Sequence, residues 1–145
     1  MKIDVETNQL ITNNMRRLNS RFSAQFAFKQ HRETGGSTVM NMGHGHSIPS
    51  EGYVVGGLIP ETIIPIEIHC HSKDLFLLLW KSYSKLCNIN QCIGTWENKE
   101  GSLVFDISQV VESEHEARAL AFLRGEDSYY DLNLNQTTYL DEVHD

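Results

Sequence analysis

The chain has 145 residues, of which 40% are hydrophobic and 21% are charged, and its formal net charge is −7. These values fit one domain spanning residues 1–145, with residues 1–20 expected as an N-terminal arm or helix. The acidic balance disfavours binding to duplex nucleic acid, and neither a membrane-spanning stretch nor a signal peptide is predicted, so the expected compartment is a reducing cytoplasm.

The first predicted elements are β-strands. In "RFSAQFAFKQ", residues 21–30, aromatic and small residues alternate with polar ones, which is the period of a half-buried strand. Three further strand-like runs follow at 37–42, 51–57 and 63–70. Pro65 has no N–H to donate, so the last run is expected at an edge or a bulge.

A clear helix and a hairpin come next. The segment "SKDLFLLLWKSYSKLCN" carries a broad apolar face, begins with Ser72 as a plausible N-cap, and is expected to end at Asn88 or Asn90. Two β-prone runs then flank the loop "ENKEG", which predicts a hairpin over residues 91–108.

The C-terminal third predicts a second helix and a second hairpin. Residues 113–125 form an apolar-periodic segment in which Ser113 and Glu116 make a capping box and Gly125 occupies the left-handed C-cap position. The runs "SYYDLNL" and "TTYL" are expected to close the chain as a hairpin around "NQ". The fold class predicted from this order is α+β, a mainly antiparallel sheet with two principal helices packed on one face.

Histidine pairs raise the hypothesis of a metal site. On a strand, Glu67, His69 and His71 would project from one face, where His44 and His46 could meet them, and such side chains suit zinc. The alternative interpretation is that the first three form the solvent side of a strand and the other two are turn residues beside glycines. Because the H-x-H pattern has low specificity, we predict no metal or cofactor and keep the four histidines as candidates.

No catalytic motif accompanies these pairs. The glycine pairs Gly35–Gly36 and Gly56–Gly57 lack the pattern of a phosphate-binding loop, and a role in turns explains them better. Cys70 would face away from its flanking histidines on a strand. The sequence therefore predicts a protein that is not an enzyme.

Aromatic and arginine side chains of the C-terminal half form the candidate ligand site. Bases stack on aromatic rings, and arginines bind phosphate through charge-assisted hydrogen bonds. Arg124 is the first choice, because the helix end before Gly125 opens toward the closing hairpin, and Arg118 is the second. The aromatic candidates are Trp96, Tyr129, Tyr130 and Tyr139, although Trp96 and Tyr130 could instead belong to the core.

Three segments of the chain resemble a family of small phage-encoded proteins. The first has a G-x-T motif followed by G-x-x-P-x-x-G-Y-x-V, the second a G-x-W followed by D-x-S and a helix, and the third a closing Y-D-L hairpin. The matching positions are Gly36, Thr38, Gly45, Pro49, Gly52, Tyr53, Val55, Gly94, Trp96, Gly101, Asp106, Ser108, Ala117, Ala121, Tyr130, Asp131 and Leu132.

Within that group, the chain is similar to Thoeris anti-defence proteins, which sequester a cyclic ADP-ribose immune signal without cleaving it. The resemblance implies a small α+β protein in the host cytoplasm that assembles into a homo-oligomer and binds a nucleotide-like ligand. The site residues it implies are Arg124, Arg118, Tyr130, Asp131 and Trp96. The closing strand departs from the pattern because it has no arginine, and Gly125 and Glu126 stand where amides are expected.

Two alternatives come from other functional classes. An acidic protein–protein inhibitor would cover a basic surface of a host defence protein or nuclease with its acidic C-terminal region. A histidine-dependent metalloenzyme would use the H-x-H pairs.

Overall fold

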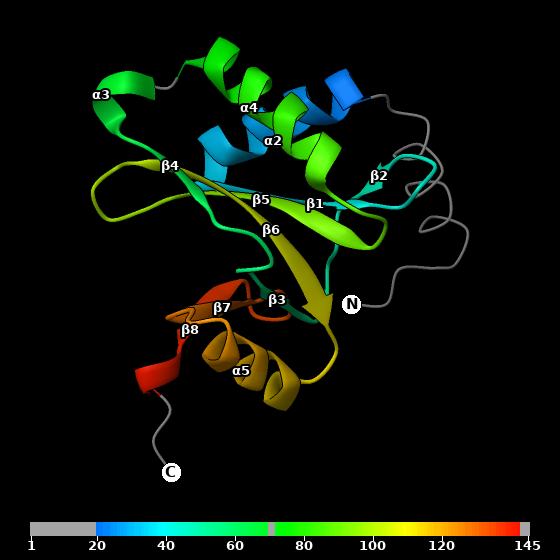
Figure 1. The fold of residues 1–145 in the computed structure, drawn as a ribbon, viewed down its shortest axis with the longest axis vertical. Coiled ribbons are helices and arrows are strands. Elements are labelled where there is room, and N and C mark those ends of the chain that lie inside the picture. The colour runs from blue at the N-terminus through cyan, green and yellow to red at the C-terminus, as the bar shows by residue number, and fades with distance from the viewer. Residues whose placement is uncertain (1–19, 70–71, 143–145) are drawn as a thin grey trace.

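The computed structural model describes residues 20–69 and 72–142 and has an α+β fold, as predicted (Figure 1). Within these residues, an antiparallel eight-stranded sheet is combined with four helices. In the described ranges, no helix has both the length and the apolar character to cross a bilayer. In chain order the elements are α2 (Ser20–Thr34), β1 (Gly36–Asn41), β2 (His46–Ser47), β3 (Tyr53–Val55), β4 (Thr62–Ile64), α3 (Ile66–His69), α4 (Lys73–Leu86), β5 (Gln91–Glu97), β6 (Leu103–Val111), α5 (Glu114–Leu123), β7 (Ser128–Asp131), β8 (Gln136–Tyr139) and the 3₁₀ turn η1 (Leu140–Glu142).

Strand β6 is the centre of the sheet. The strand order is β2-β1-β5-β6-β3-β7-β8, and β4 also pairs with β6. One edge of β6 pairs with β5 along nearly its whole length, for example Ile93 opposite Ile107. The other edge pairs with β4 over residues 103–105 and with β3 over residues 109–111. Two separate segments of the chain therefore meet on one edge of the same strand.

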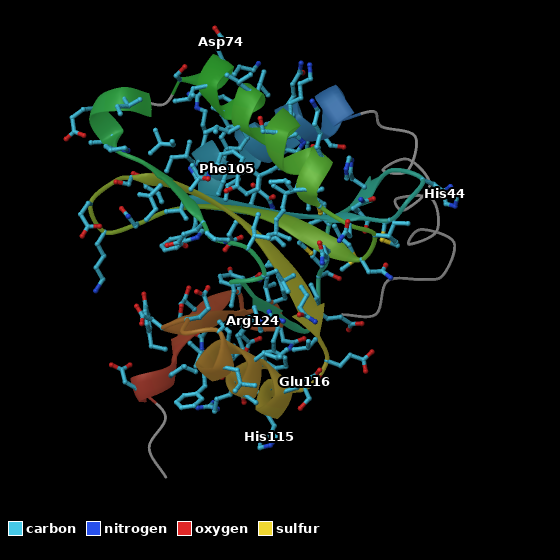
Figure 2. All side chains as sticks on the ribbon, viewed as in Figure 1. His44, Asp74, Phe105, His115, Glu116 and Arg124 are labelled. Carbon is cyan, nitrogen blue, oxygen red and sulfur yellow. The ribbon has the colours of Figure 1, made fainter. Side chains whose placement is uncertain are left out.

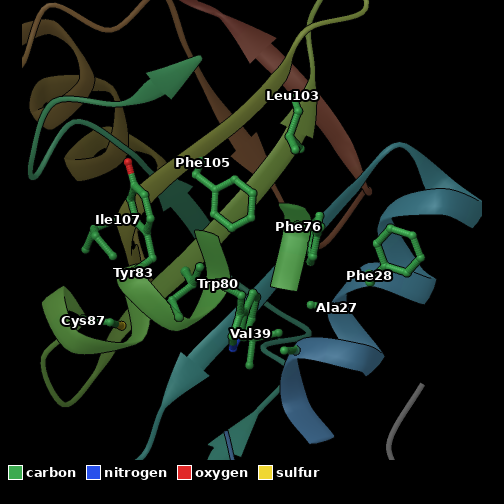
Figure 3. Packing of buried hydrophobic residues seen from close by; sticks show 12 residues of the cluster. Ala27, Phe28, Val39, Phe76, Trp80, Tyr83, Cys87, Leu103, Phe105 and Ile107 are labelled. Atoms are coloured by element: carbon green, nitrogen blue, oxygen red, sulfur yellow. The ribbon is translucent and has the colours of Figure 1, made fainter. Parts of the chain in front are cut away.

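Two hydrophobic clusters flank β6 at its two ends. Figure 2 places Phe105 under the helices α2 and α4, whereas Glu116 and His115 lie on α5 at the opposite end of the molecule. The larger cluster is the main core, and its side chains interlock between α2, α4 and the sheet (Figure 3). Its fully buried members include Ala27, Val39, Phe76, Trp80 and Phe105.

The smaller cluster lies under α5. Ala117 and Ala121 are completely buried on the inner side of this helix, and they pack against Val55, Val111 and Tyr129. Small side chains at positions four residues apart let the helix backbone approach the strands closely. The result is a second, compact core built from β3, β7 and the end of β6.

Both predicted limits of α5 are confirmed. The Glu116 N–H donates to Ser113 Oγ at 3.3 Å, so Ser113 is the N-cap. At the other end Gly125 has φ of +73°, and the next N–H, from Glu126, donates to the Ala121 carbonyl at 2.8 Å. This is the pattern of a Schellman motif, which directs the chain after the helix back toward the sheet.

The start of α4 and the two hairpins are also confirmed. Leu75 N–H donates to Ser72 Oγ at 3.3 Å, although the helix ends at Leu86, before the predicted asparagines. Strands β5 and β6 form the first hairpin, and β7 and β8 form the second. The turn of the second hairpin spans residues 132–135, slightly before the predicted "NQ".

The prediction of a strand at 21–30 is wrong, because this segment belongs to the helix α2. Ala24, Ala27 and Phe28 are buried at helical spacing, whereas Phe26 is 40% exposed. The apolar residues therefore satisfy periods of both 2 and 3.6, and packing of α2 against α4 and β1 decides in favour of the helix. Of the arm or helix predicted at 1–20, residues 1–19 lie outside the described residues, and Ser20 begins α2.

The prediction of one strand over residues 63–70 is also wrong. Strand β4 ends at Ile64, and the short helix α3 follows Pro65, whose carbonyl accepts from Ile68 N–H at 2.9 Å. Proline is favoured just at the start of a helix, where its missing N–H is not needed. Glu67 and His69 consequently do not share a strand face, while Cys70 and His71 lie outside the described residues.

Strand β3, in the run predicted at 51–57, is an interior strand of the sheet. It pairs with β6 and with β7, so Val54 lies between Val110 and Tyr130. The ends of the strand order are instead β2 and β8. Residues 43–45 form the turn between β1 and β2, where Met42 N–H donates to the Gly45 carbonyl at 2.9 Å, so His44 lies in a turn.

We expect Phe105→Ala to lower the free energy of unfolding by about 3–5 kcal/mol, because it leaves a cavity in the centre of the main core. Leu78→Ala is the matched control, since Leu78 is 63% exposed and should change stability by no more than about 0.5 kcal/mol. Urea denaturation measures both, and equal effects of the two substitutions would contradict the assignment of this core.

Candidate functional site

A cavity of about 350 Å³ opens beside the end of α5. Residues 57–61, which leave β3 and lead to β4, form one wall, and Arg124 and Glu126 form the other. Figure 2 shows Arg124 between the upper part of the sheet and α5. The volume is at the small end of the range for ligand pockets, and charged groups of both signs border it.

Arg124 is the cation in this wall, and the fold fixes its position. Nη1 donates to the carbonyl oxygens of Gly56 at 3.2 Å and Val55 at 3.5 Å, and Nη2 donates to Oε1 of Gln109. The side chain therefore joins the end of α5 to β3 and β6. A guanidinium has five N–H donors, more than these contacts use, so it retains capacity to bind an anion.

Two carboxyl groups lie close to Gly56, whose carbonyl oxygen accepts from Arg124. A Cβ added to Gly56 would lie 2.8 Å from Asp106 Oδ2 and 2.9 Å from Glu126 Oε1, so both oxygens border the position that glycine leaves open. Burial, followed by the negative charges of Glu126 and Glu61, raises the pKa of Asp106 to about 7. At neutral pH the Asp106 carboxyl is therefore protonated in a large fraction of molecules.

The pKa of Glu126 is also raised above its usual range. Burial is the main cause that raises its pKa, the charges of Glu61 and Asp127 add to the effect, and Arg124 opposes it. Glu126 and Asp106 both lie beside Gly56, and negative charge on Glu126 disfavours ionisation of Asp106. The cavity wall thus contains Glu126 beside the fixed cation Arg124, and Asp106 lies next to Glu126 behind this wall.

Gly94 shapes the opposite side of Asp106. The two residues are cross-strand partners in β5 and β6, and a Cβ on Gly94 would overlap Asp106 Oδ1. Ser108 Oγ is 3.8 Å from the same point. Only glycine leaves room for the carboxyl group at this position, which gives a physical role to two of the positions matched in the resemblance.

Arg118, the second predicted arginine, lies in a different environment. Its Nη2 donates to the hydroxyl of Tyr129 at 2.9 Å, and that hydroxyl donates to Glu114 Oε2 at 2.7 Å. The guanidinium also lies 5.7 Å from the centre of the Tyr129 ring. Burial, followed by the hydrogen bond to Glu114, raises the pKa of Tyr129 to about 12. The hydrogen bond of Arg118 thus links α5 to β7. Arg118 does not line the cavity.

The remaining predicted ligand residues are also not in the cavity wall. Asp131 is 5% exposed and accepts hydrogen bonds from the N–H groups of Asn133 at 2.8 Å and Leu134 at 3.1 Å, which is a turn-stabilising role. Tyr130 on β7 is 36% exposed, and Trp96 on β5 is 42% exposed. Of the five predicted residues, Arg124 alone lines the cavity.

The histidines do not gather into a metal site in the part of the chain that the structure describes. Nowhere in residues 20–69 and 72–142 do three histidine, cysteine or acidic side chains lie close enough to bind one ion. His44 is exposed on the loop between β1 and β2 (Figure 2). His46 Nδ1 lies 2.8 Å from Ser23 Oγ, and burial lowers its pKa. The side chain of His69 and the whole of His71 lie outside the described residues.

The sequence alone does not assign these carboxyl groups to a site. The sequence singles out Asp106 only as a position of the D-x-S motif. It singles out Glu126 only as a residue that departs from the pattern of the resembling family. The predicted hairpin around "ENKEG" places Gly94 near the part of β6 that carries Asp106, but its pairing with Asp106 follows from a turn centred one residue later, over residues 98–102. Nothing local in the sequence brings Glu61 and Glu126 to that position, since they come from opposite sides of the cavity.

Comparison of the chain with protein-family models, curated proteins and solved structures found no significant match to any of them. The resemblance to anti-defence proteins therefore stays a prediction.

We expect Asp106→Asn to stabilise the protein at pH 8 by about 1–4 kcal/mol and to have little effect near pH 4. The folded-state pKa is raised to about 7, so the parent loses stability as the pH rises from about 4 through 7, and the amide removes this loss. Asp74→Asn, at an exposed position on α4, is the control (Figure 2). Urea denaturation between these pH values gives the difference, and a destabilised Asn variant at pH 8 would contradict the expectation.

Proposed function

We propose that this chain binds a small nucleotide-like ligand in the cavity beside Arg124 and sequesters it without cleaving it. The observation that carries the proposal is the guanidinium of Arg124, held in the cavity wall by backbone carbonyls that leave donors free. A phosphate group suits such a guanidinium, because its oxygens accept charge-assisted hydrogen bonds.

The carboxylates of the wall support a ligand that also carries hydrogen-bond donors. Glu61 and Glu126 can accept hydrogen bonds from ribose hydroxyls or from the amino groups of a base. A bare inorganic anion offers no such donors and would meet only the repulsion of these carboxylates. Nucleotides combine both features, which favours them over simple anions.

The state of the thiols supports binding without covalent chemistry. Burial raises the pKa of Cys87 to about 11 and that of Cys92 to about 12. Thiols are nucleophilic as thiolates, so these two side chains are poor nucleophiles near neutral pH. The proposed role is therefore retention of an intact ligand. In an infected host cytoplasm, such a protein would withhold a cyclic ADP-ribose signal from the defence system that responds to it.

We further propose that the protein acts as a homo-oligomer that pairs through β8. This strand lies at one end of the strand order and consists of the uncharged residues 136–139. Uncharged, β-prone edge strands favour pairing with another strand. Antiparallel pairing of two β8 strands would place the acidic turn η1 of one copy near the asparagine-rich turn of the other, which keeps the acidic ends apart.

Native mass spectrometry tests binding and assembly together. We expect a dimer or larger assembly that gains the mass of cyclic ADP-ribose when this compound is added, and chromatography of the mixture should return the compound intact. A monomer would contradict the assembly. Failure to gain the ligand mass would contradict the binding role, and protein-dependent loss of the compound would show that the protein is an enzyme.

Arg124→Ala should weaken binding of cyclic ADP-ribose about ten- to a hundredfold, because a charge-assisted contact to phosphate is worth roughly 1.5–3 kcal/mol. Arg118→Ala is the matched control on the same helix, and His44→Ala is a control on an exposed loop. Calorimetric titration measures the three affinities, with circular dichroism as a check of folding. Parent-like affinity of a folded Arg124→Ala variant would exclude this site.

An acidic protein–protein inhibitor is the second candidate. The observation that favours it is the outer surface of α5, where Phe122 and Leu123 are each 76% exposed and Glu114 and Glu116 are exposed in the first turn. Exposed apolar side chains beside acidic ones suit a partner protein with a basic rim. In the native mass spectrum this function would appear as a bound polypeptide in place of the nucleotide.

A further inference from the structure

We infer that Asp106 and Glu126 retain one proton between them beside the Arg124 cavity, and that an anionic ligand group binds in this cavity together with that proton. The retained proton is a property of the protein alone. Its coupling to ligand binding rests on the proposed binding function and makes the affinity of that site depend on pH.

The geometry of Gly56 brings the two acids together. Asp106 Oδ2 and Glu126 Oε1 each lie within 3 Å of the position of a Cβ on this glycine, at 2.8 Å and 2.9 Å. Asp106 comes from the middle of β6, and Glu126 comes from the turn after α5. A carboxyl pair built from two different elements in this way is held by the fold, and it favours one proton over two negative charges.

The charged groups around Asp106 support the same conclusion. Glu126 faces it from the turn after α5, Glu61 faces it from the segment before β4, and the thiol of Cys92 faces it from β5. Arg124 acts on Glu126 and is the cation of the cavity wall. Of these carboxyl groups, Glu126 is the one whose pKa Arg124 lowers, and the guanidinium already donates to two carbonyl groups and Gln109. A retained proton lowers the negative charge around Asp106.

Ser108 provides an independent observation next to the pair. It is 1% exposed, and apart from the thiol of Cys92, a weak partner, its Oγ has no hydrogen-bond partner in the described structure. Oγ and Asp106 Oδ1 both border Gly94 on the same side of the sheet. A buried hydroxyl without a strong partner is costly, so this pocket around Asp106 retains unused hydrogen-bonding capacity.

The pKa of Asp106, raised to about 7 by burial and then by the neighbouring carboxylates, places the exchange of this proton near neutral pH. Below that pH the pair already carries the proton, and the affinity for an anion should be constant. Above it, binding of the anion must take up a proton from solvent, so the affinity should fall by up to about tenfold per pH unit.

Carbon NMR of the carboxyl groups in the ligand-free protein tests the retained proton. We expect the Asp106 signal to titrate near neutral pH and the Glu126 signal to titrate above its usual range, and we expect Glu126→Gln to move the titration of Asp106 to lower pH. Asp74→Asn, remote from the cavity, should leave it unchanged. Titration of both carboxyl groups below about pH 5 would overturn the inference, whatever happens with ligands.

Calorimetry with cyclic ADP-ribose tests the coupling. Titrations between pH 6 and 9, in two buffers of different ionisation enthalpy, should show uptake of a proton above neutral pH. Asp106→Asn should make the affinity independent of pH and, at pH 8.5, about tenfold tighter than that of the parent. Glu126→Gln provides a second variant if the first does not fold.

The outcomes separate the two proposals. An Asp106 carboxyl group that titrates near neutral pH in a protein that does not bind cyclic ADP-ribose would support the retained proton and contradict the binding function. Binding with an affinity that does not change between pH 6 and 9 would support the binding function and overturn the coupling.

Discussion

The structure depends on the central position of β6. Its nine residues pair with β5 along one edge, and the other edge is divided between β4 and β3. The main core covers one end of this strand, and the smaller core under α5 covers the other. Because both cores share a single strand, the helices α4 and α5 are fixed relative to each other although they belong to different clusters.

The candidate site forms where the division of that edge leaves a gap. Between the residues paired with β4 and those paired with β3, the segment 106–108 has no strand partner on this side among the described residues. The turn at Gly56 and the end of α5 occupy the space, and Arg124 hydrogen-bonds to groups from both neighbouring strands. A break in strand pairing therefore produces a cavity with fixed charged groups.

Local signals in the sequence predicted the elements that depend on short-range chemistry. The caps at Ser72 and Ser113, the left-handed Gly125 and both C-terminal hairpins follow from hydrogen bonds and dihedral preferences that span a few residues. The segment 21–30 was misassigned because its apolar residues satisfy two periods, and only contacts with distant elements select one.

The candidate site was predictable only in part, for the same reason. Arg124 could be placed near the closing hairpin because it directly precedes the helix C-cap glycine. The raised pKa of Asp106 depends on burial and on Glu61 and Glu126, whose approach is set by tertiary structure. No periodicity or motif in a single sequence encodes that approach. For the same reason, the spacing of His44 and His46 does not show which side chains they meet, and His46 Nδ1 in fact lies 2.8 Å from Ser23 Oγ on α2.

The central claim is that the gap beside β6 is the place where ligand binds. Two-dimensional NMR of the backbone amides, recorded while cyclic ADP-ribose is added, tests it most directly. The structure predicts that shifts concentrate in residues 56–61 and 124–126, around the cavity. Shifts confined to the loop carrying His44 and His46, or to the outer surface of α5, would contradict the account.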